Sequence, residues 1–201
     1  ILASASQDGT VRLWDVATST AIATFQTGWA FCVAWSPDGG RIAVGTYGGE
    51  IQIWDITTQE LLHTWRSATG SPIISIGWSP DGGTIASGEL WGNIYLWDAG
   101  SGEIRQTISG YTEARRDVNG LAWSPDGNTL ATAHQDGQVR LWDPRTAQLI
   151  LEINAHTGWV RGVAWSPDGS FLASTGEDRR IVLWNPVTGQ AYAEQHHNRL
   201  P

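Results

Sequence analysis

Two tryptophan markers recur along this 201-residue chain with one common period. The first marker is a Trp followed by Ser-Pro-Asp-Gly, and the second is a Trp that ends an apolar run, usually as Trp-Asp. Successive copies of each marker lie 40 to 45 residues apart, which makes chance a poor explanation and indicates stacked repeat units. The first marker stands at Trp35, Trp78, Trp123 and Trp165, and the second at Trp14, Trp54, Trp97, Trp142 and Trp184.

Each repeat unit contains short apolar runs separated by turn residues, a pattern that predicts β-strands. In the most complete unit, one run ends at Trp165, the turn Ser166–Gly169 follows, and two further runs lead to Trp184. Pro presets the first turn corner, Asp can bond its own backbone and Gly accepts a positive φ, so the motif is turn chemistry and not a catalytic motif. Apolar residues fall on both faces of runs such as Val139–Trp142, which suits a sheet packed between two others.

A period of this length with Trp-Asp at a strand end is typical of WD repeats. The chain resembles the WD-repeat β-propeller family over essentially its whole length, and its Trp-Ser-Pro-Asp-Gly motifs look like those of bacterial members. A second propeller family with this motif lacks regular Trp-Asp pairs, so it fits less well. The resemblance implies an all-β propeller of four-stranded antiparallel blades, with about 4.75 blades present and part of a seven-bladed ring.

We expect one domain, residues 1–201, built of successive blades. The predicted divisions are a partial blade at 1–26, full blades at 27–66, 67–109, 110–154 and 155–195, and a connector to a missing blade at 196–201. The chain begins at Ile1 within a repeat and contains no Met, so we interpret it as a fragment of a longer protein. An open arc would expose two apolar blade faces, and self-association through these open blade edges is a further expectation.

The last unit also matches a set of polar residues that WD repeats share. The resemblance implies a structural tetrad in which the indole of Trp184 donates to Ser174, Ser174 to His156, and His156 to Asp178. Partial tetrads occur in two other units, where the His is missing: Ser4, Asp8 and Trp14 in the first, and Thr132, Asp136 and Trp142 in the fourth.

The second and third units depart further from the tetrad. Gln26 and Gly48 occupy the His and Asp positions in the second unit, and Thr69 and Trp91 occupy them in the third. We therefore expect these two blades to depend more on packing than on this tetrad network.

A Ser, a His and an Asp in one unit raise a hydrolase hypothesis, which we consider weak. A nucleophile needs an exposed hydroxyl beside an oxyanion hole, whereas Ser174 lies in the middle of a strand with its proton committed to the network. We predict no catalytic residue, no metal ligand and no cofactor, because the five His are scattered and the Gly residues lie in turns. Cys32 lies in an apolar run, which predicts a buried, inert thiol.

The four strands of a blade are labelled a to d from the propeller axis outward. Propellers of this family usually bind other proteins or peptides on the face that carries the b–c turns and the d–a connections. Aromatic and Arg residues are the usual anchors of such interfaces. Trp91 is the best candidate, because it occupies a turn where other units have Asp or Gly, whereas Trp29 and Trp159 could equally be half-buried packing residues. The candidate partner face comprises Trp29, Tyr47, Trp91, Tyr111, Arg115, Arg116, Trp159 and Arg179.

Charge and hydropathy narrow the function further. The net charge of −8 argues against a nucleic-acid partner, and no apolar run approaches the roughly 18 residues of a membrane span. We expect a cytoplasmic, non-enzymatic scaffold or sensor platform for protein–protein interaction. The alternative is a regulatory sensor domain of a larger bacterial signalling enzyme, a kinase or a nucleotide-binding ATPase. An enzyme with its site in the propeller channel is a third hypothesis, but no acid, base or metal set converges there.

Overall fold

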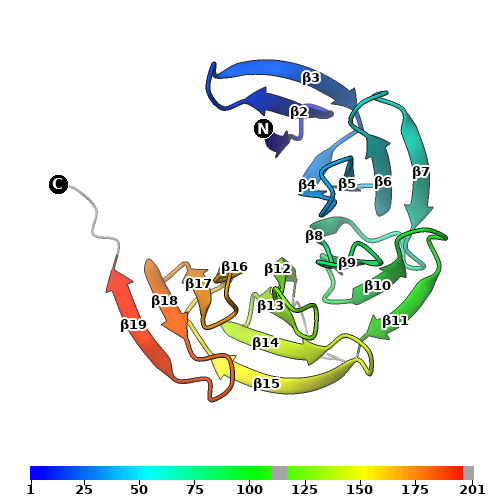
Figure 1. Cartoon of the computed structure of the whole chain (residues 1–201). Coiled ribbons are helices and arrows are strands. Elements are labelled where there is room, and N and C mark those ends of the chain that lie inside the picture. Colours follow the sequence, from blue (N-terminus) through cyan, green and yellow to red (C-terminus); the bar gives the residue numbers. More distant parts are fainter. Residues whose placement is uncertain (110–116, 197–201) are drawn as a thin grey trace.

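The computed structural model describes residues 1–109 and 117–196, which form nineteen β-strands and no helix. The strands make five separate antiparallel sheets, one of three strands and four of four strands. Figure 1 shows the sheets side by side in an open arc around a common centre. The predicted all-β propeller of four-stranded blades is therefore confirmed, and each sheet is called a blade below.

The chain builds the blades in order, and within each blade consecutive strands are neighbours. The first blade is β1 (Leu2–Ala5), β2 (Thr10–Asp15) and β3 (Thr20–Gln26). The second is β4 (Ala30–Trp35), β5 (Arg41–Thr46), β6 (Glu50–Asp55) and β7 (Leu61–Arg66). The third is β8 (Ile73–Trp78), β9 (Thr84–Glu89), β10 (Ile94–Asp98) and β11 (Ile104–Ile108). The fourth is β12 (Val118–Trp123), β13 (Leu130–His134), β14 (Gln138–Asp143) and β15 (Gln148–Asn154), and the fifth is β16 (Val160–Trp165), β17 (Leu172–Gly176), β18 (Arg180–Trp184) and β19 (Ala191–His196).

Both tryptophan markers lie at fixed places in the blade. The Trp before Ser-Pro-Asp-Gly is the last residue of the innermost strand in each four-stranded blade, as at Trp35 and Trp165. The second marker lies at the end of strand c, and the pairing with strand d shifts by one residue immediately before it, as at Leu141/Trp142. The shift leaves one unpaired residue in strand d of every blade, at the same position relative to the Trp.

The hydrophobic core consists of four clusters, each shared by two neighbouring blades. One cluster joins Ile51 and Ile53 of the second blade to Ile73, Ile85 and Trp97 of the third, and all five side chains are almost completely buried. Apolar residues on both faces of strand c are thus explained, because each inner blade is covered on both sides.

The first and last blades each have one face without a neighbouring blade among the described residues (Figure 1). Ile181 on β18 is 47% exposed, whereas the equivalent residues Val11, Ile51, Ile94 and Val139 are 0% exposed. At the other end, Leu2 on β1 is 57% exposed, whereas its equivalents Ile42, Ile85, Leu130 and Leu172 are 0% exposed. Equivalent strand positions are therefore buried where a neighbouring blade covers them and exposed where none does.

The Ser-Pro-Asp-Gly segments form the turns that their residues predict. In the last copy, the Ser166 hydroxyl donates to Asp168 at 2.7 Å, and the same carboxylate accepts the backbone N–H of Ser170 at 3.0 Å. Gly169 then adopts a φ of 71°, in the left-handed region that a side chain would disfavour. The Ser hydroxyl and the backbone amide lower the pKa of Asp168 to about 2, and they lower the pKa of its three counterparts Asp38, Asp81 and Asp126 in the same way.

These turns predict a specific loss of stability in acid. Their folded-state pKa values lie below the roughly 3.9 of an unfolded Asp, so their stabilisation is present above about pH 4 and is lost as the pH falls toward 2. We expect Asp168→Asn to lower the melting temperature at about pH 5, and the difference from wild type to shrink as the pH falls through about 2. Thermal unfolding followed by circular dichroism across this range tests the idea, which fails if the difference does not depend on pH.

The uneven burial of strand c gives a second prediction. Ile51→Ala should cost about 2–5 kcal/mol of unfolding free energy, because it leaves a cavity between two blades. Ile181→Ala, the same change at the same strand position, should cost less than about 1 kcal/mol because the residue is half exposed. Urea unfolding measures both values. Equal costs would show that the face of the fifth blade is covered in solution.

Candidate functional site

The antiparallel order of strands divides the turns between two faces of the arc. The Ser-Pro-Asp-Gly turns and the c–d turns lie at one end of the strands, which we call the lower face. The b–c turns and the connections between blades lie at the opposite end, which we call the upper face. All residues of the predicted partner face that the structure describes belong to upper-face segments.

The tetrad residues of the fifth blade meet in one buried network. The Trp184 indole donates to the Ser174 hydroxyl at 2.8 Å, and this hydroxyl lies 2.7 Å from Nε2 of His156. Nδ1 of His156 lies 2.8 Å from the Asp178 carboxylate. Burial raises the pKa of Asp178, but the hydrogen bonds from His156 and from the backbone amides of Thr157 and Arg180 outweigh it, and the net pKa is lowered. The carboxylate is therefore charged near neutral pH and holds the imidazole in place.

This network resembles a catalytic triad only in composition. Ser174 is 0% exposed, and its oxygen already accepts the indole N–H. A substrate carbonyl cannot approach a hydroxyl that is enclosed on all sides. The arrangement orders the blade and offers no nucleophile.

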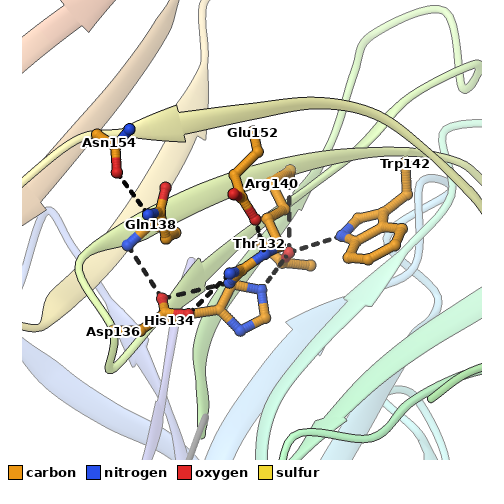
Figure 2. A network of polar contacts seen from close by, with 8 residues as sticks. All are labelled: Thr132, His134, Asp136, Gln138, Arg140, Trp142, Glu152 and Asn154. Carbon is orange, nitrogen blue, oxygen red and sulfur yellow. Dashed lines mark hydrogen bonds and ion pairs between the residues drawn. The ribbon is translucent and has the colours of Figure 1, made fainter. Parts of the chain in front are cut away.

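The fourth blade builds its network from a residue that the sequence pattern does not single out (Figure 2). The Trp142 indole donates to Thr132 at 2.8 Å, as in the tetrad. Nε2 of His134 lies 2.8 Å from the Thr132 hydroxyl, and His134 follows Thr132 by two residues on the same strand, β13. Ala114, which stands at the expected His position, lies outside the described residues.

Gly176 explains why the fifth blade can use a histidine from the connection before it. Gly176 occupies the position in β17 that His134 occupies in β13, two residues after the hydroxyl. A Cβ atom at Gly176 would overlap the imidazole of His156. The space beside the hydroxyl is thus filled by an imidazole in both blades, from the same strand in the fourth and from the preceding connection in the fifth. When the histidine comes from the connection, the strand position next to it must be a glycine.

Asp136, predicted as part of a partial tetrad, binds Arg140 in the same network (Figure 2). The Arg140 guanidinium contacts Asp136 and Glu152, both at 2.7 Å, while its side chain is only 2% exposed. Burial raises the pKa of Asp136, but Arg140 outweighs this effect and the net pKa is lowered. The first blade has the matching ion pair on its uncovered face, where Arg12 lies 3.1 Å from Asp8. In the same blade, the Trp14 indole donates to the Ser4 hydroxyl at 2.8 Å.

The second blade replaces the Ser or Thr hydroxyl with an amide. Val44 stands at the hydroxyl position, and the Trp54 indole donates instead to Oε1 of Gln52 at 3.2 Å. Nε2 of Gln52 donates to the Thr27 carbonyl at 3.1 Å, so the buried amide joins the blade to the connection before it.

The third blade uses a carboxylate in the same region. The Trp97 indole donates to Ser87 at 2.8 Å. Glu89, 0% exposed, accepts hydrogen bonds from Thr69 at 2.8 Å and from Asn93 at 3.0 Å. Neither of these two blades forms the His-containing tetrad, but each has polar contacts of its own at this place: Gln52 accepts the half-buried Trp54 indole in the second blade, and Ser87 accepts the buried Trp97 indole in the third.

Three aromatic side chains of the second blade form an exposed cluster on the upper face. The Trp29 and Tyr47 rings pack edge to face with centroids 5.4 Å apart, and the Phe31 ring lies 5.9 Å from that of Tyr47. The backbone N–H of Tyr47 donates to the Trp29 carbonyl at 2.9 Å, which fixes the two residues side by side. Trp29 is 58% exposed and Tyr47 52%, so Trp29 is not a half-buried packing residue. We call Trp29, Phe31 and Tyr47 the aromatic cluster.

The remaining candidates of the partner face are distributed along the arc. Trp91 is 59% exposed in the b–c turn of the third blade. In the fifth blade, Trp159 lies beneath the Arg161 guanidinium, 4.5 Å from the ring, and Arg161 also pairs with Glu177. Arg179 is exposed in a turn with a φ of 65°. Three candidates lie outside the described residues: Tyr111, Arg115 and Arg116.

Other reactive groups give no evidence of chemistry. The Cys32 thiol is enclosed between Gly45 and Ile73, and burial raises its pKa to about 12, although the residue as a whole is only half-buried. Within residues 1–109 and 117–196, no three His, Cys, Asp or Glu side chains lie close enough together to hold a metal ion. No helix capable of crossing a membrane occurs in the same ranges.

The tetrad predicts that two histidines contribute differently to the free energy of unfolding. We expect His156→Ala to lower the unfolding free energy by about 1–3 kcal/mol, because Ser174 and Asp178 lose a buried partner. His63→Ala, a change on the exposed strand β7, should cost less than about 0.5 kcal/mol. Chemical denaturation of both variants decides the matter, and equal effects would exclude a structural role for the network.

Comparisons with known proteins agree with this geometry. The chain matches the WD domain, G-beta repeat, at residues 1–15, 59–98, 102–143 and 147–185, and an anaphase-promoting complex subunit 4 WD40 domain at residues 30–78. Similar proteins include the U3 small nucleolar RNA-associated protein 12 of Saccharomyces cerevisiae, 34% identical over 38% of this chain and 8% of that protein. Periodic tryptophan protein 2 of Arabidopsis thaliana is 42% identical over 32% of the chain and 7% of that protein. The cell division cycle 20.1, cofactor of APC complex, of the same plant is 33% identical over 34% of the chain and 16% of that protein.

The chain thus spans a small part of each of these relatives, which are eukaryotic. The comparisons give no support to bacterial-type repeats or to a bacterial signalling enzyme. The matches to the G-beta repeat cover more than half of the chain, and the blades and the tetrad have the form that its repeats imply. This chain belongs to the WD domain, G-beta repeat family.

Proposed function

We propose that this chain is a non-enzymatic platform that binds other proteins or peptides on its upper face, with the aromatic cluster as the anchor. The observation that carries the proposal is the exposure of Trp29, Phe31 and Tyr47, three adjoining rings on one blade. Aromatic residues are enriched among the anchors of protein interfaces because they bury large areas at a low entropic cost. Adjoining exposed rings on a rigid blade provide such an anchor before any partner arrives.

The chemistry around the cluster indicates what kind of contact forms there. The turns 47–49 and 90–92 and the connection 67–72 contain no Asp, Glu, Lys, Arg or His. Trp91 adds another exposed ring in the neighbouring blade. A partner would therefore be held over the second and third blades by apolar contact and by hydrogen bonds to uncharged groups.

Two further observations favour binding over catalysis. The described Ser-His-Asp set is enclosed around Ser174 and is used within the blade. The name of one relative describes a cofactor of a complex, a role in which a rigid platform is useful.

Selection of random peptides displayed on phage, with the immobilised chain as the target, provides ligands for a direct test. We expect the selected peptides to share aromatic, aliphatic or proline side chains and to lose affinity when Trp29 and Tyr47 are both replaced by Ala. Selected peptides whose affinity is unchanged in that double variant would contradict an upper-face site at the aromatic cluster.

Trp91 gives a quantitative prediction. Trp91→Ala should weaken binding of such a peptide by about 1–3 kcal/mol and leave the melting temperature almost unchanged, because the residue is 59% exposed. Isothermal titration calorimetry measures the affinity. The control is Leu149→Ala, which removes an exposed apolar side chain from outer strand β15 and should leave binding intact. A large loss of thermal stability would instead show that Trp91 is a packing residue.

A further inference from the structure

A groove on the lower face, between the fourth and fifth blades, has no role in the function proposed above. It has a volume of about 300 Å³ and lies between the Ser-Pro-Asp-Gly turns of the two blades and the c–d turn of the fifth. A groove at the equivalent place between the third and fourth blades has a volume of about 450 Å³. We call them the 4/5 groove and the 3/4 groove, and the repeat makes their residues directly comparable.

The walls of the two grooves differ in chemistry at two equivalent positions. Ile150 is the unpaired residue of β15 opposite Leu141/Trp142, and Arg105 is the unpaired residue of β11 opposite Leu96/Trp97. Val187 follows the Pro of one c–d turn, and Arg145 follows the Pro of the other. Two arginines of the 3/4 groove are thus replaced by two aliphatic side chains in the 4/5 groove.

The aliphatic side chains of the 4/5 groove are open to solvent. Ile150 is 55% exposed and Val187 84% exposed, while Leu141 beneath them is buried at 1%. Pro125, Trp165 and Pro186 complete the apolar lining. An apolar hollow whose rim side chains face water is favourable for burying an aliphatic side chain of a partner.

Two charged carboxylates line the same groove without a basic neighbour in its lining. Asp126 and Asp168 have lowered pKa values because of the Ser hydroxyl and backbone N–H groups that bind them, so both are ionised near neutral pH. No Arg or His is among the residues that line the 4/5 groove. In the 3/4 groove, Arg105 lies close enough to Asp81 to contribute to its lowered pKa. Asp126 lines both grooves and so shares the 3/4 groove with Arg105 and Arg145, whereas Asp168 lines the 4/5 groove alone, in a lining without a basic side chain.

We propose that the 4/5 groove binds an extended protein segment that places an aliphatic side chain beside a basic one. The aliphatic side chain lies over Leu141 between Ile150 and Val187, and the basic group interacts with Asp126 and Asp168. The apolar hollow supplies affinity, and the carboxylates, Asp168 above all, select a partner of positive charge. This site lies at the opposite end of the strands from the aromatic cluster, so it does not depend on the function proposed above.

The test uses a capped peptide that contains one leucine followed by one arginine, flanked by glycines. The readout is the NMR signal of the Trp165 indole N–H, which lies in the groove and donates to the Ala122 carbonyl at 3.1 Å. We expect this signal to shift saturably during titration, while that of Trp123, which lines the 3/4 groove, shifts less. Peptides with Gln in place of Arg, or Ser in place of Leu, should bind at least about tenfold more weakly. Equal binding of the Gln peptide, or no shift at Trp165, would overturn the proposal.

Substitutions in the chain complete the experiment. The double variant Ile150→Arg/Val187→Arg copies the 3/4 groove and should reduce affinity at least about tenfold, because it adds positive charge beside a basic ligand. The matched control is Ile22→Arg, at the same unpaired position of β3 and 48% exposed, which should bind as wild type does. Asp168→Asn should abolish the preference for Arg over Gln. Equal losses in the control and the double variant would refute a site in the 4/5 groove, whereas Trp91→Ala should leave this binding unchanged.

Discussion

The burial of each blade between two others is the interaction on which this structure depends. No blade has a core of its own, because buried side chains such as Ile51 and Ile53 belong to a cluster that includes residues of the next blade. Stability in such a molecule is approximately a sum over neighbouring pairs. The exposed Ile181 and Leu2 support the same conclusion, since their equivalents are fully buried wherever a neighbouring blade exists.

Much of the fold could be predicted from the sequence because its signals are local. A Trp at a strand end, a Pro-Asp-Gly turn and an apolar run each act within a few residues, and the period places the copies in order. The expected propeller and the turn chemistry followed from these signals. Whether the full ring has seven blades, and whether open blade faces associate, stay predictions, because both depend on contacts outside the described residues.

The polar networks could be predicted only in part, because they depend on which side chains reach one place in space. A search at a fixed offset finds His156 but misses His134, which reaches the same place from its own strand. Gln52 and Glu89 were missed because their residue types differ from those of the tetrad. A sign was present in the sequence, since Gly176 and His134 stand at equivalent positions. Its meaning becomes visible only when the ring of His156 is seen to occupy the space that a side chain at Gly176 would fill.

The two origins of the histidine ring also affect the order in which the buried networks can form during folding. In the fourth blade, the hydroxyl and the ring are two residues apart and the indole is ten residues from the hydroxyl, all within one hairpin. In the fifth blade, the ring is 18 residues from the hydroxyl and lies on the connection that follows β15. Closing a longer loop costs more chain entropy. The fourth blade can therefore satisfy its tryptophan and hydroxyl as soon as β13 and β14 pair, whereas the fifth must wait until the preceding connection has docked.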